Sequence, residues 1–181
     1  MADPTNRQTP VAGTLHEGHV LLENTDGARD LYSKSRFGTM LAGGKVKLSF
    51  LEAAYLIDKG KISLKNGTKR IALEDVLRAG KKREKTFATK FIVFRDLRSR
   101  GYTVKTALKF GAEFRVYDRG VVPGVGHAKW IVYPVHETGS TTWYELSAKN
   151  RVAHSTKKRL LLAIVDDDDD VTYYEMAWTR P

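Results

Sequence analysis

The sequence predicts a mixed α+β protein built from two small domains. Strong helix signatures end at Gly101, and after it the apolar period changes to the alternation that is typical of strands. A polar stretch, residues 80–85, precedes the last of these helices and is interpreted as a linker. We therefore expect an N-terminal α/β domain over residues 1–83, with residues 1–13 as a flexible tail. Residues 84–181 are expected to form a C-terminal domain with a mixed β-sheet flanked by helices.

The N-terminal domain is expected to combine short helices and strands. Its clearest helix covers residues 49–59, because Ser49 and Glu52 form a capping box and Gly60 follows as a C-cap. Residues 38–48 contain paired glycines and are predicted to be a loop. The shorter elements expected here are strands at residues 19–22 and 61–64 and helices at residues 27–33 and 72–78.

The C-terminal domain is expected to begin with a helix over residues 86–100, where apolar residues recur at helical spacing. In the strand that follows at residues 113–117, alternation predicts that Phe114 and Val116 point inward and that Arg115 and Tyr117 point outward. The remaining expected elements are strands at residues 102–107, 129–135, 159–165 and 171–178, and a helix at residues 142–154.

Composition narrows the class of protein. Of the 181 residues, 41% are apolar and 29% are charged, which is typical of a globular protein and excludes a mainly disordered chain. The longest apolar run is Leu160–Val165, far short of the roughly 20 residues that a membrane span needs. The absence of cysteine excludes disulfides, thiolate metal sites and thiol catalysis. Residues 1–10 lack the apolar core of a signal peptide, so we expect a cytoplasmic protein.

The charge is unevenly placed along the chain. The formal net charge is +10, and residues 81–119 carry twelve Lys or Arg against four Asp or Glu, a net +8. Such a segment is suited to a polyanionic partner, although a solvated helix face is the plain alternative. The opposite extreme is Asp166, Asp167, Asp168, Asp169 and Asp170, which would repel phosphates and which read as a solvated hairpin turn.

Few residues suggest chemistry by themselves. His16 and His19 give a weak metal signal, and no metal-binding motif of recognised spacing is present. Tyr117 and His127 stand at either end of a Gly/Pro-rich loop, residues 120–126. Because histidine titrates near neutral pH, this loop is a candidate site for proton transfer.

Three segments together suggest a family. They are KFGAEFRVYDR (residues 109–119), Gly126-His127 before an apolar strand, and RVAHSTKKRLLLAIVDDDDDVTYY (residues 151–174). In order and spacing they resemble the catalytic subunit of the archaeal tRNA-splicing endonuclease, most strongly over residues 86–178 and more weakly over residues 28–60. The resemblance implies a restriction-endonuclease-like C-terminal domain and an endoribonuclease that uses neither metal nor cofactor.

The resemblance assigns a catalytic group to each segment. It places the tyrosine at Tyr117, the histidine at His127 and the lysine at Lys158, the second of a lysine pair. Ala128 departs from the serine that often follows the histidine, but that serine is not catalytic. In this hypothesis Tyr117 is the base or only orients the attacking 2′-hydroxyl, His127 is the acid, and Lys158 stabilises the charged transition state.

The resemblance also implies a substrate and an assembly. The substrate is precursor tRNA with a bulge–helix–bulge element, and Arg151 is expected to stack on a splayed base. The assembly is a homotetramer, or a heterotetramer with a related subunit, in which Asp166–Asp170 dock into a basic pocket. Lys45 and Lys47 are candidates for a basic feature that broadens substrate choice.

Three other functions remain open at this stage. A non-catalytic subunit of the same complex would lack the Tyr, His and Lys group. An RNA-binding module would bind in a salt-sensitive way without cleavage. A metal-dependent DNA nuclease would need paired acidic ligands near a lysine, whereas the aspartates stand together in one turn.

Overall fold

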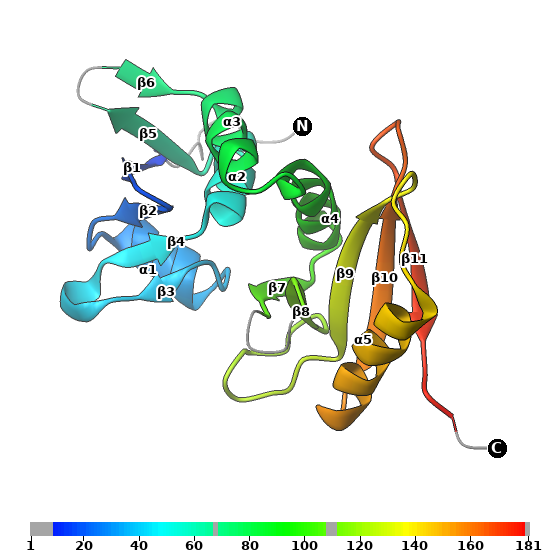
Figure 1. The fold of residues 1–181 in the computed structure, drawn as a ribbon. Coiled ribbons are helices and arrows are strands. Elements are labelled where there is room, and N and C mark those ends of the chain that lie inside the picture. Colours follow the sequence, from blue (N-terminus) through cyan, green and yellow to red (C-terminus); the bar gives the residue numbers. More distant parts are fainter. Residues whose placement is uncertain (1–8, 67–68, 108–111, 180–181) are drawn as a thin grey trace, which may run out of the picture. The chain divides into compact units, whose positions relative to one another are not determined.

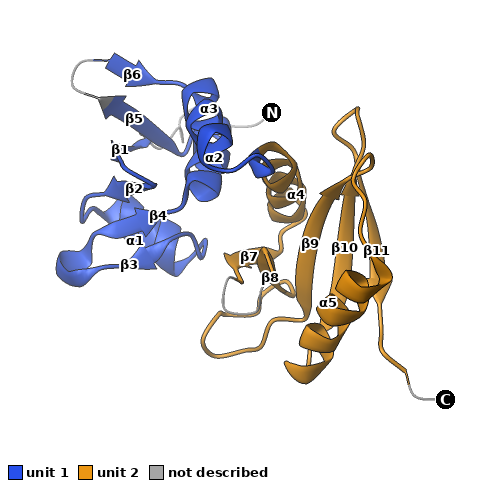
Figure 2. Cartoon of the chain, in the orientation of Figure 1, with its two compact units in different colours: residues 1–87 blue, residues 88–181 orange. Residues whose placement is uncertain are grey.

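The computed structural model describes residues 9–66, 69–107 and 112–179, and the chain divides into two compact units, residues 1–87 and 88–181 (Figure 2). The elements of the first unit are β1 (Val11–His16), β2 (His19–Leu22), α1 (Asp26–Ser33), β3 (Thr39–Met40), the 3₁₀ turn η1 (Ala42–Gly44), β4 (Val46–Leu48), α2 (Phe50–Asp58), β5 (Ile62–Asn66), β6 (Lys69–Ile71) and α3 (Leu73–Arg83). Its strands form a mixed sheet of order β3-β4-β2-β1-β5-β6, in which β1 and β5 run parallel.

The predicted loop at residues 38–48 is wrong, because this segment contributes strands to the sheet. β4 pairs with β2 in antiparallel register, with Val20 opposite Leu48 and Leu22 opposite Val46. All of these side chains are fully buried. The paired glycines do form a turn. β4 has only three residues, which are too few for its alternation of apolar and polar side chains to stand out in the sequence.

The predicted tail at residues 1–13 is also too long. Residues 1–8 lie outside the described residues, whereas β1 begins at Val11. Gly13 lies so close to the core that an added Cβ would come within 2.7 Å of Leu22 and 2.8 Å of Leu64. Residues 11–13 therefore belong to the packed sheet.

The polar stretch at residues 80–85 is mostly helical, which corrects its interpretation as a linker. α3 continues to Arg83, and the units divide after Phe87. Gly80 lies in this helix, and the ring of Phe87 occupies the space that a Cβ at Gly80 would need. Charged residues in the last turn suit a helix end, since its dipole favours cations there.

The capping box that predicts α2 is confirmed. Ser49 Oγ accepts a hydrogen bond from the backbone N–H of Glu52 (3.2 Å), and the Glu52 carboxylate accepts one from the backbone N–H of Ser49 (2.9 Å). The same carboxylate accepts a hydrogen bond from the backbone N–H of Gly38 (2.8 Å). Glu52 therefore joins the start of α2 to the segment that leads into β3.

The second unit contains a mixed sheet of order β11-β10-β9-β8-β7, here called the C-terminal sheet (Figure 1). β9 and β10 run parallel, and the other neighbours run antiparallel. The elements are α4 (Phe87–Ser99), β7 (Thr103–Thr106), β8 (Phe114–Tyr117), β9 (Trp130–His136), α5 (Trp143–Ser155), β10 (Arg159–Val165) and β11 (Val171–Met176). The mixed α+β fold is thus confirmed. Within the described ranges, no helix is long and apolar enough to cross a membrane.

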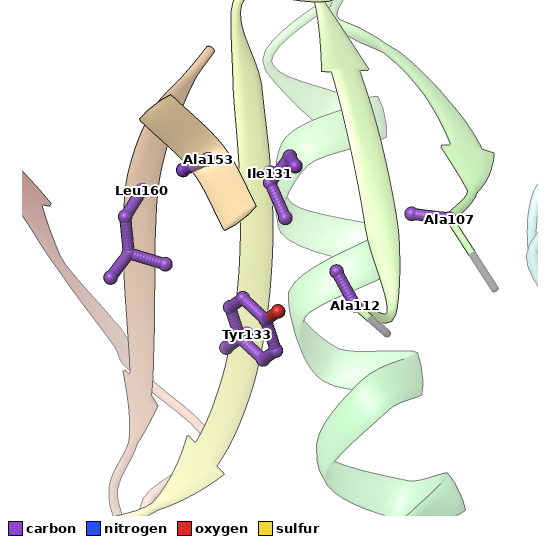
Figure 3. Packing of buried hydrophobic residues seen from close by; sticks show 6 residues of the cluster. All are labelled: Ala107, Ala112, Ile131, Tyr133, Ala153 and Leu160. Atoms are coloured by element: carbon purple, nitrogen blue, oxygen red, sulfur yellow. The ribbon is translucent and has the colours of Figure 1, made fainter. Parts of the chain in front are cut away.

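The two faces of the C-terminal sheet are covered by different helices. On the α5 face, Ala153 packs in a buried cluster with Ile131 and Leu160, which are opposite one another in the β9–β10 register (Figure 3). On the α4 face, the ring centroids of Phe94 and Phe114 lie 6.0 Å apart. Since side chains alternate along a strand, this pairing assigns every strand residue of the sheet to one face.

Candidate active site at one end of the C-terminal sheet

The strand register brings three predicted site residues to the same end of the C-terminal sheet. Tyr117 is the last residue of β8, which is antiparallel to β9, whereas β10 is parallel to β9. The backbone of Lys129 joins the three strands, because its N–H donates to Val116 O (2.9 Å) and its carbonyl accepts from the N–H of Arg159 (3.0 Å). Tyr117, His127 and Lys158 each lie within two residues of this crossing.

Tyr117 is buried, with 5% of its surface exposed, which contradicts its predicted outward orientation. Alternation along β8 does sort Phe114 and Val116 to one face and Arg115 and Tyr117 to the other. Both faces are covered, however, so the second face is not a solvent face. Thr103 of β7 lies opposite Tyr117 in the strand register and is itself buried.

His127 is exposed and follows a tight turn. The N–H groups of Val125 and Gly126 both donate to the carbonyl of Val122, at 3.1 and 2.9 Å. An added Cβ on Gly126 would come within 2.5 Å of the Val121 side chain, so a larger residue here would displace that side chain. Ala128 is buried on the other side of His127. The imidazole is therefore presented to solvent between two anchored residues.

Lys158 owes its position to the way that α5 ends. The N–H of Lys157 donates to the carbonyl of His154 (2.9 Å), and the N–H of Lys158 donates to the carbonyl of Ala153 (2.8 Å). This is a Schellman motif, with Lys157 in the left-handed conformation (φ 55°) that glycine usually supplies. The helix end thus fixes the backbone of Lys158 directly before β10.

The ammonium of Lys158 lies in a setting that disfavours its charge. The side chain is half-buried, and its Nζ donates a hydrogen bond to the carbonyl of Thr156 (2.8 Å). Burial is the main cause that lowers the pKa of Lys158 below its ordinary value, and the nearby positive charge of Arg115 lowers it further. A bound phosphate would relieve this repulsion between cations.

Arg115 is a further candidate for the site, which the sequence by itself did not single out. It lies on the same face as Tyr117, two residues earlier in β8, and its Nε donates to the carbonyl of Thr106 (3.1 Å). Lys105 is its direct partner across the β7–β8 pair, so both cations share the α5 face. The alternation of β8 could have found Arg115, whereas Lys105 needed the pairing register.

Arg151 is exposed on α5, about one helical turn before the end of that helix. His154, three residues further on, is its neighbour on the helix surface. The ring of His154 meets Trp178 edge-on, with centroids 4.4 Å apart. Arg151 thus lies beside an aromatic pair on the face of the helix that is open to solvent.

The predicted aspartate turn is confirmed, and its members are not equivalent. Asp166 accepts hydrogen bonds from the N–H groups of Asp168 (3.0 Å) and Asp170 (2.9 Å), so its carboxylate holds the turn together. The four residues after Asp166 are exposed. His136, the last residue of β9, and Glu137, which follows it, contact Asp167 at this opposite end of the sheet.

A metal site requires several ligand side chains in one place. Among the residues that the structure describes, no group of three or more His, Asp or Glu side chains is arranged to hold a metal ion. His16 and His19 stack on one another, with ring centroids 5.2 Å apart, at the β1–β2 turn of the other unit.

Comparison with known proteins defines the class. A family model described as the N-terminal domain of tRNA intron endonuclease matches residues 11–77, and one described as its catalytic C-terminal domain matches residues 87–173. The second match contains the whole candidate site. The chain is therefore an enzyme of the class that cleaves tRNA introns from their precursors.

Curated relatives agree along nearly the whole chain. The tRNA-splicing endonuclease of Thermococcus kodakarensis is 45% identical over 166 residues, covering 92% of this chain and 96% of the relative. The protein of that name from Methanothermobacter thermautotrophicus is 40% identical over 171 residues, covering 94% and 99%. The chain belongs to the tRNA-splicing endonuclease family, which confirms the resemblance seen in its sequence.

Proposed function

We propose that the chain cuts precursor tRNA at bulge–helix–bulge splice sites by metal-independent transesterification. The products are a 2′,3′-cyclic phosphate and a 5′-hydroxyl. The observation that carries this proposal is the convergence of Tyr117, His127 and Lys158 at one end of the sheet in an enzyme of this family. These side chains are the kinds of group that cleavage by the RNA's own 2′-hydroxyl requires.

The reaction is balanced by proton transfers alone. Tyr117 accepts or orients the proton of the 2′-hydroxyl while its oxygen attacks the adjacent phosphorus. The P–O5′ bond breaks, and His127 gives a proton to the departing 5′-oxygen. Lys158 stabilises the extra negative charge on the crowded phosphate. Its fixed backbone suits that task, because a preorganised charge needs little rearrangement during the reaction.

The exposures of the three side chains fit these roles. Tyr117 is buried, which favours a fixed phenol oxygen rather than a mobile one. His127 is exposed on its turn, so the imidazole remains accessible to the leaving strand and to solvent protons. Lys158 is half-buried, a setting in which its charge acts more strongly on a phosphate than it would in open water.

Assembly is part of the same proposal. Removing an intron requires two cuts, and each chain provides one such constellation, so an active assembly holds two or more chains. We expect a homotetramer, or a heterotetramer with a related subunit. The exposed aspartates 167–170 suit contact with a basic protein surface, and exposed Arg151 suits stacking on a splayed base.

The test is cleavage of an intron-containing precursor tRNA in EDTA, with chemical analysis of the new ends. We expect cyclic phosphate and 5′-hydroxyl termini at both splice sites. Binding without cleavage would indicate an RNA-binding module or a non-catalytic subunit. Activity that EDTA abolishes and Mg²⁺ restores would contradict the metal-independent reaction.

A further inference from the structure

A row of cations crosses the α5 face of the C-terminal sheet. Lys105 on β7 and Arg115 on β8 are directly opposite in the register. Lys158 lies two residues before Leu160, which belongs to the same face. All three side chains are half-buried. Their common face follows from strand pairing and from the alternation of side chains, and does not depend on any catalytic role.

This arrangement gathers positive charge on one face of the sheet. Like charges directly opposite one another on neighbouring strands are destabilising. The proximity of Arg115 also disfavours the charge of Lys158. Arg115 is nevertheless fixed, because its Nε is bound to the carbonyl of Thr106. A polyanion that binds along the row would be attracted by three positive charges on one face.

We infer that Lys105 and Arg115 form a second phosphate-binding site, which holds the RNA backbone phosphate next to the one being cleaved. The inference rests on the proposed function, since Lys158 marks the position of the scissile phosphate. Arg115 lies between Lys158 and Lys105, and its guanidinium can bridge two phosphate oxygens. The row thereby directs the RNA backbone from the reacting phosphate toward β7, the edge strand of the sheet.

The experiment measures RNA binding against salt. The probe is a bulge–helix–bulge RNA with 2′-deoxy nucleotides at the cleavage sites, so that it binds without reacting, and anisotropy is read between 50 and 200 mM KCl. The slope of log K against log salt is negative. We expect its magnitude to decrease by about 0.7–0.9 for each phosphate interaction that Lys105→Gln or Arg115→Gln removes. Over that range, the removal of one such interaction changes the ratio of affinities by about threefold.

The matched control is Arg159→Gln. Arg159 is adjacent to Lys158 but lies on the opposite face, where it binds Glu175 (2.6 Å). This variant should keep the wild-type slope, and Arg115→Lys should keep it as well because the charge remains. Thermal melts verify that each variant is folded. If Arg115→Gln does not fold, the slope of Lys105→Gln decides.

The outcomes separate the two proposals. If wild type cleaves the normal RNA and both Gln variants show the slope of the control, the second phosphate site is refuted and the proposed function stands. If wild type binds but never cleaves, the proposed function fails. A reduced slope in Lys105→Gln and Arg115→Gln, with an unchanged slope in the control, supports the site.

Discussion

The two ends of strand β10 carry opposite charge. Lys158 and the site residues stand before its first residue, and Asp166–Asp170 follow its last, about 26 Å from Lys158 at the rise of a β-strand. The parallel strand β9 repeats the contrast, with Lys129 directly before it and Glu137 directly after it. One strand pair therefore separates a surface suited to phosphates from one suited to cations.

The ends also differ in how they are held. At the basic end a helix terminus and the β-ladder fix the backbone, and the cations repel one another. At the acidic end the turn is held by one of its own carboxylates, Asp166, which leaves the other four exposed. The backbone of the basic end is thus held by the helix terminus and the sheet, whereas the acidic end is an exposed turn.

The largest expected effect comes from removing a positive charge at the basic end of β10. Lys158→Ala should lower single-turnover cleavage at saturating enzyme by about 10²–10³-fold, as expected for removing a charge that stabilises the transition state. Lys157→Gly is the matched control, because it removes the adjacent charge at a position whose φ of 55° suits glycine, and it should retain the rate. Equal reductions of rate and of RNA affinity in Lys158→Ala would instead indicate phosphate binding.

A second variant removes the exposed negative charges at the acidic end of β10. Replacing residues 167–170 together by Asn should lower the native mass in sedimentation and lower cleavage with it, because the exposed carboxylates are removed. Asp166 is kept in this variant, so the turn retains its internal hydrogen bonds. An unchanged sedimentation coefficient would rule out a role of these aspartates in assembly.

Asp166→Ala sharpens the difference within the turn. The N–H groups of Asp168 and Asp170 lose their acceptor, so the free energy of unfolding should fall by about 1 kcal/mol in a denaturant titration. The four exposed aspartates remain, and the native mass should be unchanged at temperatures where the variant is folded. Equal stability of variant and wild type would show that the turn does not need this carboxylate.

The smallest expected effect concerns pH. Burial and Arg115 both lower the pKa of Lys158, so its charge disappears at a lower pH than that of a free lysine. Cleavage that depends on this charge should therefore decline on the alkaline side before pH 10.5, the ordinary value. In Arg115→Gln one of the two causes is removed, and the alkaline limb of the single-turnover rate should move to higher pH. A limb that moves lower would contradict the assigned proximity.

Much of the fold followed from local pattern. The capping box of α2 and the apolar run of β10 identified their elements because each signal lies within a few adjacent residues. The loop predicted at residues 38–48 is wrong because β4 gains its stability from pairing with β2, and the paired glycines before β4 are typical of a loop. Short strands depend on partners that are distant in sequence, which local periodicity does not reveal.

The candidate site shows the same division. The order and spacing of Tyr117, His127 and Lys158 could be read from the chain, and so could the abundance of positive charge around them. The burial of Tyr117 could not be read, because it depends on what covers the second face of β8. The pairing of Lys105 with Arg115 is likewise a property of strand register.

The sequence by itself determined the family, the residue types of the site and the separation of charge into a basic segment and an acidic run. Only the tertiary structure decided that Lys158 and the aspartate run lie at opposite ends of a strand that pairs in parallel with β9. It also decided that Arg115 lies on the same face as Lys158 and that the Asp166 carboxylate accepts hydrogen bonds within its own turn. The physical reason is that charge and residue type are local, whereas register, burial and the repulsion between cations arise only when distant segments pair.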